Sequence, residues 1–412
     1  MRKFLAHWVL QFPEWSWILL GLALRLVLAW KVGGGFRQVD EGGFDAAAWT
    51  LARSGVLPAA APLPSAFFAL CFRVFGHSLL YPRLAQAFLS AATAWALGRM
   101  TSRLTGSLTA GRLALALSAI YPFFIYYSAM MLSETLYLAA VVCGLWWLCA
   151  SLQGKGAGFW CPPAAGLALA AAALCRSEGA GVAAGIWAVS GVLCCLRRWS
   201  WRAWCMAVLF WMLPLLAWCA RNQAVIGRFV LDNRGGIAML EGTMFFDLNE
   251  IDTKFSVAAV EQCPFYKESL ALPQAEQDRV FLRQSLLFMR AHPRQVLRQW
   301  ARKSVNFWRF YPRSDKVFIE DARSHPGLGL GRRALIAISL LCEPALILGG
   351  FWGLWCLRRR WETLYPLGLF LLGTMAVHVL IVSQMRYRLP VMPILIFGAA
   401  WAAAAPMERR AA

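Results

Sequence analysis

The apolar residues of this chain are gathered into long runs that short polar segments separate. Many of these runs reach the roughly 20 residues that a helix needs to cross a bilayer. We therefore predict an all-α polytopic membrane protein with about ten transmembrane helices. The predicted spans cover residues 15–31, 79–98, 112–129, 132–151, 164–181, 182–196, 203–220, 334–356, 363–382 and 388–405.

The long segment after the first predicted span, residues 32–78, contains one further apolar run. This run, Pro62–Gly76, is too short to cross a bilayer and also contains Pro64 and Arg73. We expect it to form a helix that lies in the membrane interface.

The longest polar stretch covers residues 221–333. Within it, residues 273–290 and 294–308 have the apolar spacing of amphipathic helices, so we expect a small helical subdomain there. The chain thus divides into an N-terminal transmembrane module (1–220), this large loop and a C-terminal transmembrane module (334–412).

The distribution of Lys and Arg over the short loops predicts the orientation. These residues fall in every second loop and at both ends of the chain: Arg2, Lys3, Arg99, Arg103, Arg112, Lys155, Arg197, Arg198, Arg202, Arg358, Arg359, Arg360, Arg409 and Arg410. Both termini are therefore expected to be cytoplasmic, which requires an even number of spans. Segments 32–78 and 221–333 are then external.

Composition supports the membrane interpretation. The chain is 59% hydrophobic and 15% charged, whereas soluble domains have about 45–50% apolar and about 25% charged residues. The net charge of +20 comes mostly from residues that flank apolar helices, so we expect no nucleic-acid partner. Most of the 12 cysteines lie in apolar runs, and no pattern typical of a zinc site is present.

Acidic residues are informative because a carboxylate near a bilayer is costly. Six of them are expected at the external ends of helices: Asp40, Glu41, Asp45, Glu134, Glu178 and Glu343. Four arginines are expected at the same level: Arg176, Arg221, Arg386 and Arg388. Ion pairs that hold helix ends together are an alternative explanation for each of these residues. Asp40 and Glu41 favour a functional role, because they follow a Gly-rich loop in which packing needs no acid.

These groups suit transfer from a phosphate-linked donor. A carboxylate can act as general base on an acceptor hydroxyl, and arginines can hold a leaving phosphate by bidentate hydrogen bonds. A lipid-linked donor also explains why the charges lie at the membrane boundary.

The residues resemble those of the GT-C superfamily of polyprenyl-phosphate-sugar glycosyltransferases. The resemblance is closest to the bacterial branch related to protein O-mannosyltransferases (glycosyltransferase family 39) and the aminoarabinose transferase, and it extends over most of the chain. Its motifs are Asp40-Glu41 followed by Phe44, Ala48 and Leu51; Pro64 to Gly76; Pro82-Arg83-Leu84; Tyr121-Pro122 through Tyr126-Tyr127-Ser128; Leu132-Ser133-Glu134-Thr135-Leu136; Cys175-Arg176-Ser177-Glu178-Gly179; Ala220-Arg221-Asn222 with Gly227-Arg228-Phe229; Ala291-His292-Pro293; and Arg386-Tyr387-Arg388-Leu389-Pro390. Two positions depart from the family: Phe44 stands where tyrosine is usual, and Ser177 replaces a proline.

The resemblance implies an inverting transferase without a covalent intermediate. Asp40 would be the general base, and Glu41 would orient it or help a divalent cation, which some family members use. The implied phosphate-binding residues are Arg386, Arg388, Arg221 and Arg176. The implied cavity-lining residues are Glu134, Tyr387, Phe44, Asp45 and Glu178. The donor would be a polyprenyl-phosphate sugar and the acceptor a lipid, glycan or protein, at the external face of a bacterial inner membrane.

Other classes stay open. A transporter or lipid flippase should show two related halves and broken helices, and the sequence has no internal repeat. A glycan polymerase or ligase that uses diphosphate-linked donors would also have a large external loop with arginines. A sensor or assembly scaffold would need none of the acids.

Overall fold

The computed structural model describes residues 11–38, 40–58, 62–154, 158–244, 263–310 and 329–411. Within these ranges the chain forms helices and no strand, as predicted. The predicted loop residues 245–262 and 311–328 lie outside the described residues.

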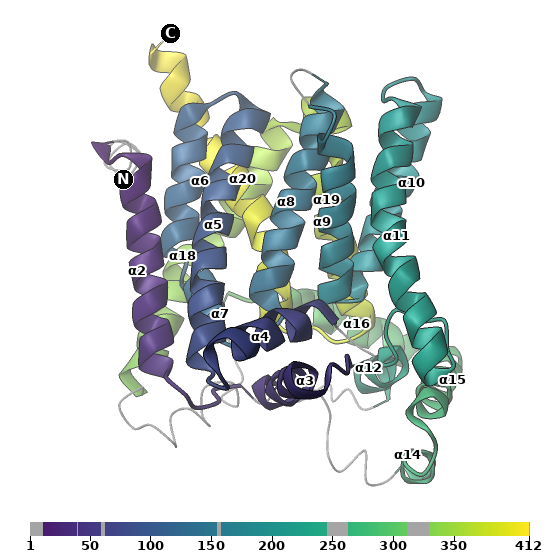
Figure 1. Ribbon diagram of the computed structural model, residues 1–412. Helices are drawn as coiled ribbons and strands as arrows, with labels where there is room; N and C mark the ends of the chain where they lie inside the picture. Colours follow the sequence, from purple (N-terminus) through teal and green to yellow (C-terminus); the bar gives the residue numbers. More distant parts are fainter. Residues whose placement is uncertain are drawn as a thin grey trace.

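Long helices run side by side and form one bundle (Figure 1). They are α2 (Glu14–Val32), α5 (Leu80–Thr105), α6 (Leu108–Ile120), α8 (Glu134–Gln153), α9 (Cys161–Cys175), α10 (Glu178–Cys195), α11 (Trp201–Ile226), α18 (Gly329–Cys356), α19 (Trp361–Leu380) and α20 (Met392–Ala411). The start of α2 and the end of α20 lie at the same end of the bundle.

In the described part of the chain, seven helices are long and apolar enough to cross a membrane. The number is eight if α6 and α7 (Pro122–Ser128), which meet at an angle of 53°, form one span. Pro122 explains the bend, because proline lacks the N–H of a continuous helix and holds the preceding residue extended. The chain is therefore a multi-pass membrane protein.

Two of the predicted spans, α5 and α9, do not meet these criteria of length and apolar character. Helix α5 contains Arg83, Arg99 and Arg103, and α9 has only 15 residues. The structure ends α9 at Cys175 and starts α10 at Glu178, whereas the sequence placed the boundary at residues 181 and 182.

Small residues let neighbouring helices approach closely. A Cβ atom on Gly353 of α18 would overlap the carbonyl oxygen of Gly398 on α20, and one on Gly166 of α9 would overlap that of Ala207 on α11. Membrane helices associate through such contacts, because lipid supplies no hydrophobic drive between them.

Short helices cover the opposite end of the bundle from the start of α2 (Figure 1). They are α3 (Glu41–Ser54), α4 (Pro62–Phe75), α12 (Gly235–Thr243), α14 (Pro264–Ser269), α15 (Gln274–Ala291) and α16 (Pro293–Phe307). Helix α4 covers the segment predicted to form an interfacial helix, and α15 and α16 match the two helices predicted in the large loop.

Helix α16 is fixed to the end of α19. The Lys303 ammonium donates to the carbonyl oxygen of Ile381 at 2.7 Å, and Ser383 donates from its hydroxyl to the carbonyl oxygen of Lys303 at 2.8 Å. The short helix η3 (Met385–Val391) follows directly, and its Arg388 donates to the carbonyl oxygen of Phe307 at 2.9 Å. These contacts hold η3 in place at the covered end of the bundle.

Candidate functional site

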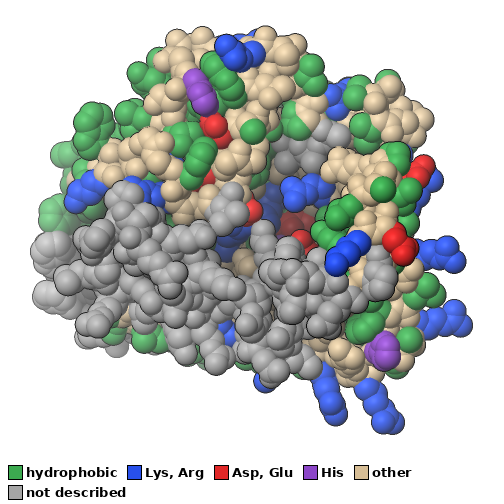
Figure 2. Space-filling model, turned by 90° about the horizontal axis from the view of Figure 1, so that it is seen from below, with side chains coloured by type: hydrophobic (Ala, Val, Ile, Leu, Met, Phe, Trp, Pro, Cys, Tyr) green, Lys and Arg blue, Asp and Glu red, His purple; other side chains and the backbone are tan. Residues whose placement is uncertain are grey.

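A cavity of about 570 Å³ opens at the end of the bundle that α3 and α4 cover. Its lining comes from seven parts of the chain: the start of α3, the segment after α3, helix α4, the start of α8, the α9–α10 junction, the segment after α11, and η3. The charged lining residues are Asp40, Glu134, Arg176, Glu178, Asp232, Arg234 and Arg386. Figure 2 shows acidic and basic side chains together in a hollow of this face.

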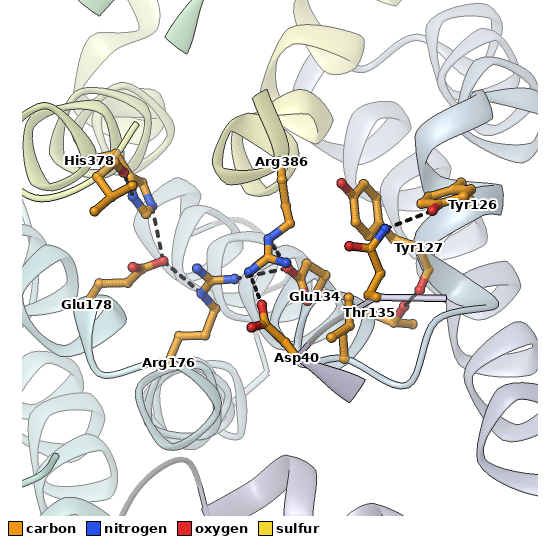
Figure 3. Close-up of polar contacts among 12 residues, drawn as sticks. Asp40, Tyr126, Tyr127, Glu134, Thr135, Arg176, Glu178, His378 and Arg386 are labelled. Carbon is orange, nitrogen blue, oxygen red and sulfur yellow. Dashed lines mark hydrogen bonds and ion pairs between the residues drawn. The ribbon is translucent and has the colours of Figure 1, made fainter. Parts of the chain in front are cut away.

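Arg386 lies between two carboxylates in this cavity (Figure 3). Its Nη2 atom donates to Oδ2 of Asp40 at 2.8 Å, and its Nε atom lies 3.1 Å from Oε1 of Glu134. The Asp40 side chain is 31% exposed, whereas that of Glu134 is 2% exposed. Asp40 is therefore the carboxylate of this group that a ligand in the cavity can reach most directly.

Arg176 continues the chain of alternating charges. Its Nη1 atom lies 3.4 Å from Oε1 of Glu134, and its Nε atom donates to Oε1 of Glu178 at 3.0 Å. His378 lies at the far end, with Nε2 3.3 Å from the same Glu178 oxygen (Figure 3). Tyr387 stacks on the His378 ring and contacts the guanidinium groups of Arg176 and Arg386 with its face.

Local sequence explains why carboxylates gather at this end of the bundle. Glu41, Glu134 and Glu178 are the first residues of α3, α8 and α10. A negative charge in the first turn interacts favourably with the helix dipole. Three helices that begin at one end of the bundle thus bring three carboxylates to the same level.

Glu41 is fully buried and has a positioning role. Its Oε1 atom accepts from Arg83 at 2.8 Å and from the Met131 N–H at 2.7 Å. Its Oε2 atom accepts from the N–H groups of Arg37 and Gln38 at 2.6 and 2.9 Å. The loop that precedes Asp40 is thereby attached to α5 and to the start of α8. Glu41 does not line the cavity, and it holds Asp40 at the edge of it.

Arg388 belongs to a separate buried cluster. It is 1% exposed, and it donates to Oε2 of Glu343 at 2.6 Å and to the carbonyl oxygens of Phe307 and Arg309. Tyr121 donates from its hydroxyl to the other Glu343 oxygen. The sequence grouped Arg388 with Arg386, but the structure holds Arg388 inside the bundle with its guanidinium occupied.

Three more predicted residues lie outside the cavity lining: Arg221, Asp45 and Tyr387, whose ring packs against Arg176 and Arg386. Arg221 stacks on Trp218 and donates to the backbone of the segment before α4, at Leu57 and Pro58. Asp45 pairs with His77 at 2.8 Å on another side of α3. Phe44, Glu134 and Glu178, in contrast, line the cavity.

Sequence reasoning missed Asp232 and Arg234, which line the cavity wall between α11 and α12. The Ser177 hydroxyl donates to Oδ2 of Asp232 at 3.0 Å, and the Arg234 N–H donates to Oδ1 at 3.1 Å. The signal that could have found them is a pair of opposite charges a few residues after an apolar helix, in the sequence Leu231-Asp232-Asn233-Arg234.

The described residues contain no group of three or more His, Cys, Asp or Glu side chains arranged to hold a metal ion. Asp40, Glu134 and Glu178 are each within ion-pair distance of an arginine. We therefore assign no step of the mechanism below to a divalent cation.

No protein-family model and no curated protein sequence matches this chain.

Proposed function

We propose that this protein is a membrane glycosyltransferase that moves a sugar from a polyprenyl-phosphate donor to a lipid, glycan or protein acceptor. The observation that carries this proposal is the contact between Asp40 and Arg386 at 2.8 Å in a cavity at one end of an apolar bundle. A carboxylate able to accept a proton and a guanidinium able to hold a phosphate lie side by side there. An apolar polyprenyl chain would lie among the neighbouring membrane helices.

In the proposed reaction, the donor phosphate binds Arg386 and displaces Asp40 from it. Phosphate oxygens compete well for a guanidinium, because the hydrogen bonds are charge-assisted. Asp40 then accepts the proton of the acceptor hydroxyl. The acceptor oxygen attacks the anomeric carbon, the bond from that carbon to the phosphate oxygen breaks, and polyprenyl phosphate leaves. One displacement inverts the configuration at the anomeric carbon.

The other charged residues of the cavity are consistent with this reaction. Glu134 lies between Arg386 and Arg176, so it keeps both guanidinium groups at the cavity wall. Arg176 is the second residue that can contact the phosphate, because it lines the same cavity. Neither Arg388 nor Arg221 has a phosphate-binding role in this scheme.

The proposal includes ten membrane crossings, with α5, α9 and the bent α6–α7 pair among them. Both termini then lie in the cytoplasm, and the cavity opens to the external face of the bacterial inner membrane. The start of α2 and the end of α20 lie at the same end of the bundle, as an even number of crossings requires (Figure 1).

The proposal predicts donor-dependent release of polyprenyl phosphate. The protein in lipid nanodiscs is incubated with a pool of polyprenyl-phosphate sugars and with membrane lipid, glycan and peptide acceptors, and mass spectrometry follows the products. We expect free polyprenyl phosphate together with an acceptor heavier by one sugar. Arg386→Gln should abolish both products, since it removes the phosphate contact and leaves Glu134 in place.

Two results would contradict the proposal. One is release of polyprenyl diphosphate from diphosphate-linked glycans with none from monophosphate donors, which would indicate a polymerase or ligase. The other is the absence of any sugar transfer with the whole pool, while the protein moves a lipid-linked sugar across the bilayer, which would indicate a flippase.

A further inference from the structure

Asp232 and Arg234 place two opposite charges on one wall of the cavity, two residues apart in the segment between α11 and α12. Among the described residues, neither side chain forms an ion pair within 4.0 Å, either with the other or with a third residue. The Asp232 carboxylate accepts from the Ser177 hydroxyl and from a backbone N–H, both of which are uncharged donors.

The other two arginines of the cavity each contact two carboxylates. Arg386 contacts both Asp40 and Glu134, and Arg176 contacts both Glu134 and Glu178. In the described lining, Arg234 is thus the guanidinium that a second anion can bind without displacing a carboxylate. Its side chain is also exposed.

The segment that carries the two charges is held from both sides. The Trp218 indole N–H donates to the carbonyl oxygen of Leu231 at 3.0 Å, and the Asn222 amide donates to that of Val230 at 2.9 Å. Beyond the pair, the Gly236 N–H donates to the Asp278 carboxylate on α15. The wall is therefore preformed, which lowers the entropic cost of binding a ligand.

We propose that Asp232 and Arg234 form the acceptor subsite, and that the acceptor is a phosphate ester that also carries hydroxyl groups. Asp232 accepts a hydrogen bond from a second hydroxyl group of the acceptor, distinct from the one that gives its proton to Asp40, and Arg234 binds the phosphate. This subsite rests on the proposed function, because it assigns the acceptor to the wall that the donor-binding residues Arg386 and Arg176 leave open.

The environment of Asp232 suits this role. Burial raises the pKa of Asp232 above its ordinary value, although the hydrogen bonds from Ser177 and the Arg234 N–H oppose the shift. A more basic carboxylate accepts a stronger hydrogen bond from a neutral hydroxyl.

Binding of glycerol phosphate, a small hydroxyl-bearing phosphate ester, tests the subsite without any sugar donor. Its affinity is measured by microscale thermophoresis with the protein in phosphatidylcholine nanodiscs. Arg234→Gln should weaken binding about tenfold, and Asp232→Ala about threefold. Arg283→Gln, which removes an exposed cation of α15 outside the cavity, should leave the affinity unchanged.

A comparison with inorganic phosphate distinguishes the contact of Arg234 with the phosphate from the contact of Asp232 with a hydroxyl group of glycerol phosphate. Inorganic phosphate should bind the parent protein more weakly than glycerol phosphate does, and Asp232→Ala, which has no side-chain acceptor, should remove this difference. Equal affinities of the two ligands for the parent, or equal binding of glycerol phosphate by the parent and Arg234→Gln, would overturn the subsite. Because the assay contains no donor, its failure is independent of whether polyprenyl phosphate is released in the transfer experiment.

A change of lipid identifies the source of the phosphate ester. In nanodiscs that contain phosphatidylglycerol, a headgroup that occupies the subsite would reduce the apparent affinity for glycerol phosphate in the parent but not in Arg234→Gln. An unchanged affinity in the parent would assign the subsite to a soluble phosphate ester.

Discussion

Asp40→Asn is expected to lower the turnover rate about 100- to 10,000-fold, the usual contribution of a general base. Asparagine keeps the size of the side chain and can still accept a hydrogen bond from Arg386, but it cannot take the proton of the acceptor hydroxyl. The measurement is the initial rate of polyprenyl phosphate release at saturating donor and acceptor. Thermal unfolding of the variant should stay close to that of the parent, because Asp40 is partly exposed.

Asp45→Asn is the matched control for this substitution. Asp45 lies on the same helix, five residues further on, and pairs with His77 away from the cavity. We expect its turnover rate to equal that of the parent within about twofold, since surface ion pairs contribute little. A comparable loss in both variants would mean that the effect reflects the fold of α3 and not a proton transfer by Asp40.

Glu41→Gln is expected to lower the free energy of unfolding by about 3–5 kcal/mol, because it removes one partner of a buried ion pair and leaves the other charge uncompensated. All four groups around the Glu41 carboxylate are donors, so the amide NH₂ of glutamine would face N–H groups. Arg83 would also be left buried without its counter-charge. Thermal or denaturant unfolding in detergent measures the effect, and turnover should fall as well, since the loop that holds Asp40 loses its attachment.

Glu362→Gln provides the comparison for Glu41→Gln. Glu362 forms the same kind of pair with Arg198, at 2.9 Å, but the two side chains are 40% and 60% exposed. Its loss should cost no more than about 1 kcal/mol. If the two glutamine variants unfolded at the same temperature, Glu41 would not have the positioning role that its contacts indicate.

The sequence predicted correctly the spans whose apolar runs are also long enough to cross a membrane. Helices α8, α10, α11, α19 and α20 all meet the criteria for crossing a membrane. The boundary between α9 and α10 was predicted wrongly, because Gly179, Ala180 and Gly181 continue the apolar run past the true break at Arg176-Ser177. A hydropathy average does not resolve a break of two residues. The ion pairs that Arg176 forms at this break depend on residues far away in the sequence, so a local pattern does not reveal them.

The sequence could predict which helix ends meet at the candidate site, but it could not predict which side chains pair there. The sequence placed Asp40, Glu134, Arg176, Glu178 and Arg386 at one depth, and the structure brings all five to one cavity. It placed Arg388 there too, because Arg386 and Arg388 are only two residues apart. The direction of each side chain depends on η3, in which Arg388 turns inward to Glu343 and Arg386 turns toward Asp40.

Asp232 and Arg234 were missed for a different reason. They belong to the long segment 221–333, which the sequence treats as one external unit with no spacing that relates it to a particular span. The contact that brings Asp232 to the cavity comes from Ser177, 55 positions away. Hydrophobic periodicity carries no information on a pairing of this kind.

The most direct test of the central claim is the affinity of polyprenyl phosphate, measured in nanodiscs for the parent, Asp40→Asn and Arg386→Gln. If the donor phosphate must displace Asp40 from Arg386, removal of the Asp40 charge should tighten binding roughly two- to fivefold, even though the same variant has lost turnover. Arg386→Gln should bind more weakly than the parent. Equal or weaker binding by Asp40→Asn would contradict the claim that Asp40 and the donor phosphate compete for one guanidinium.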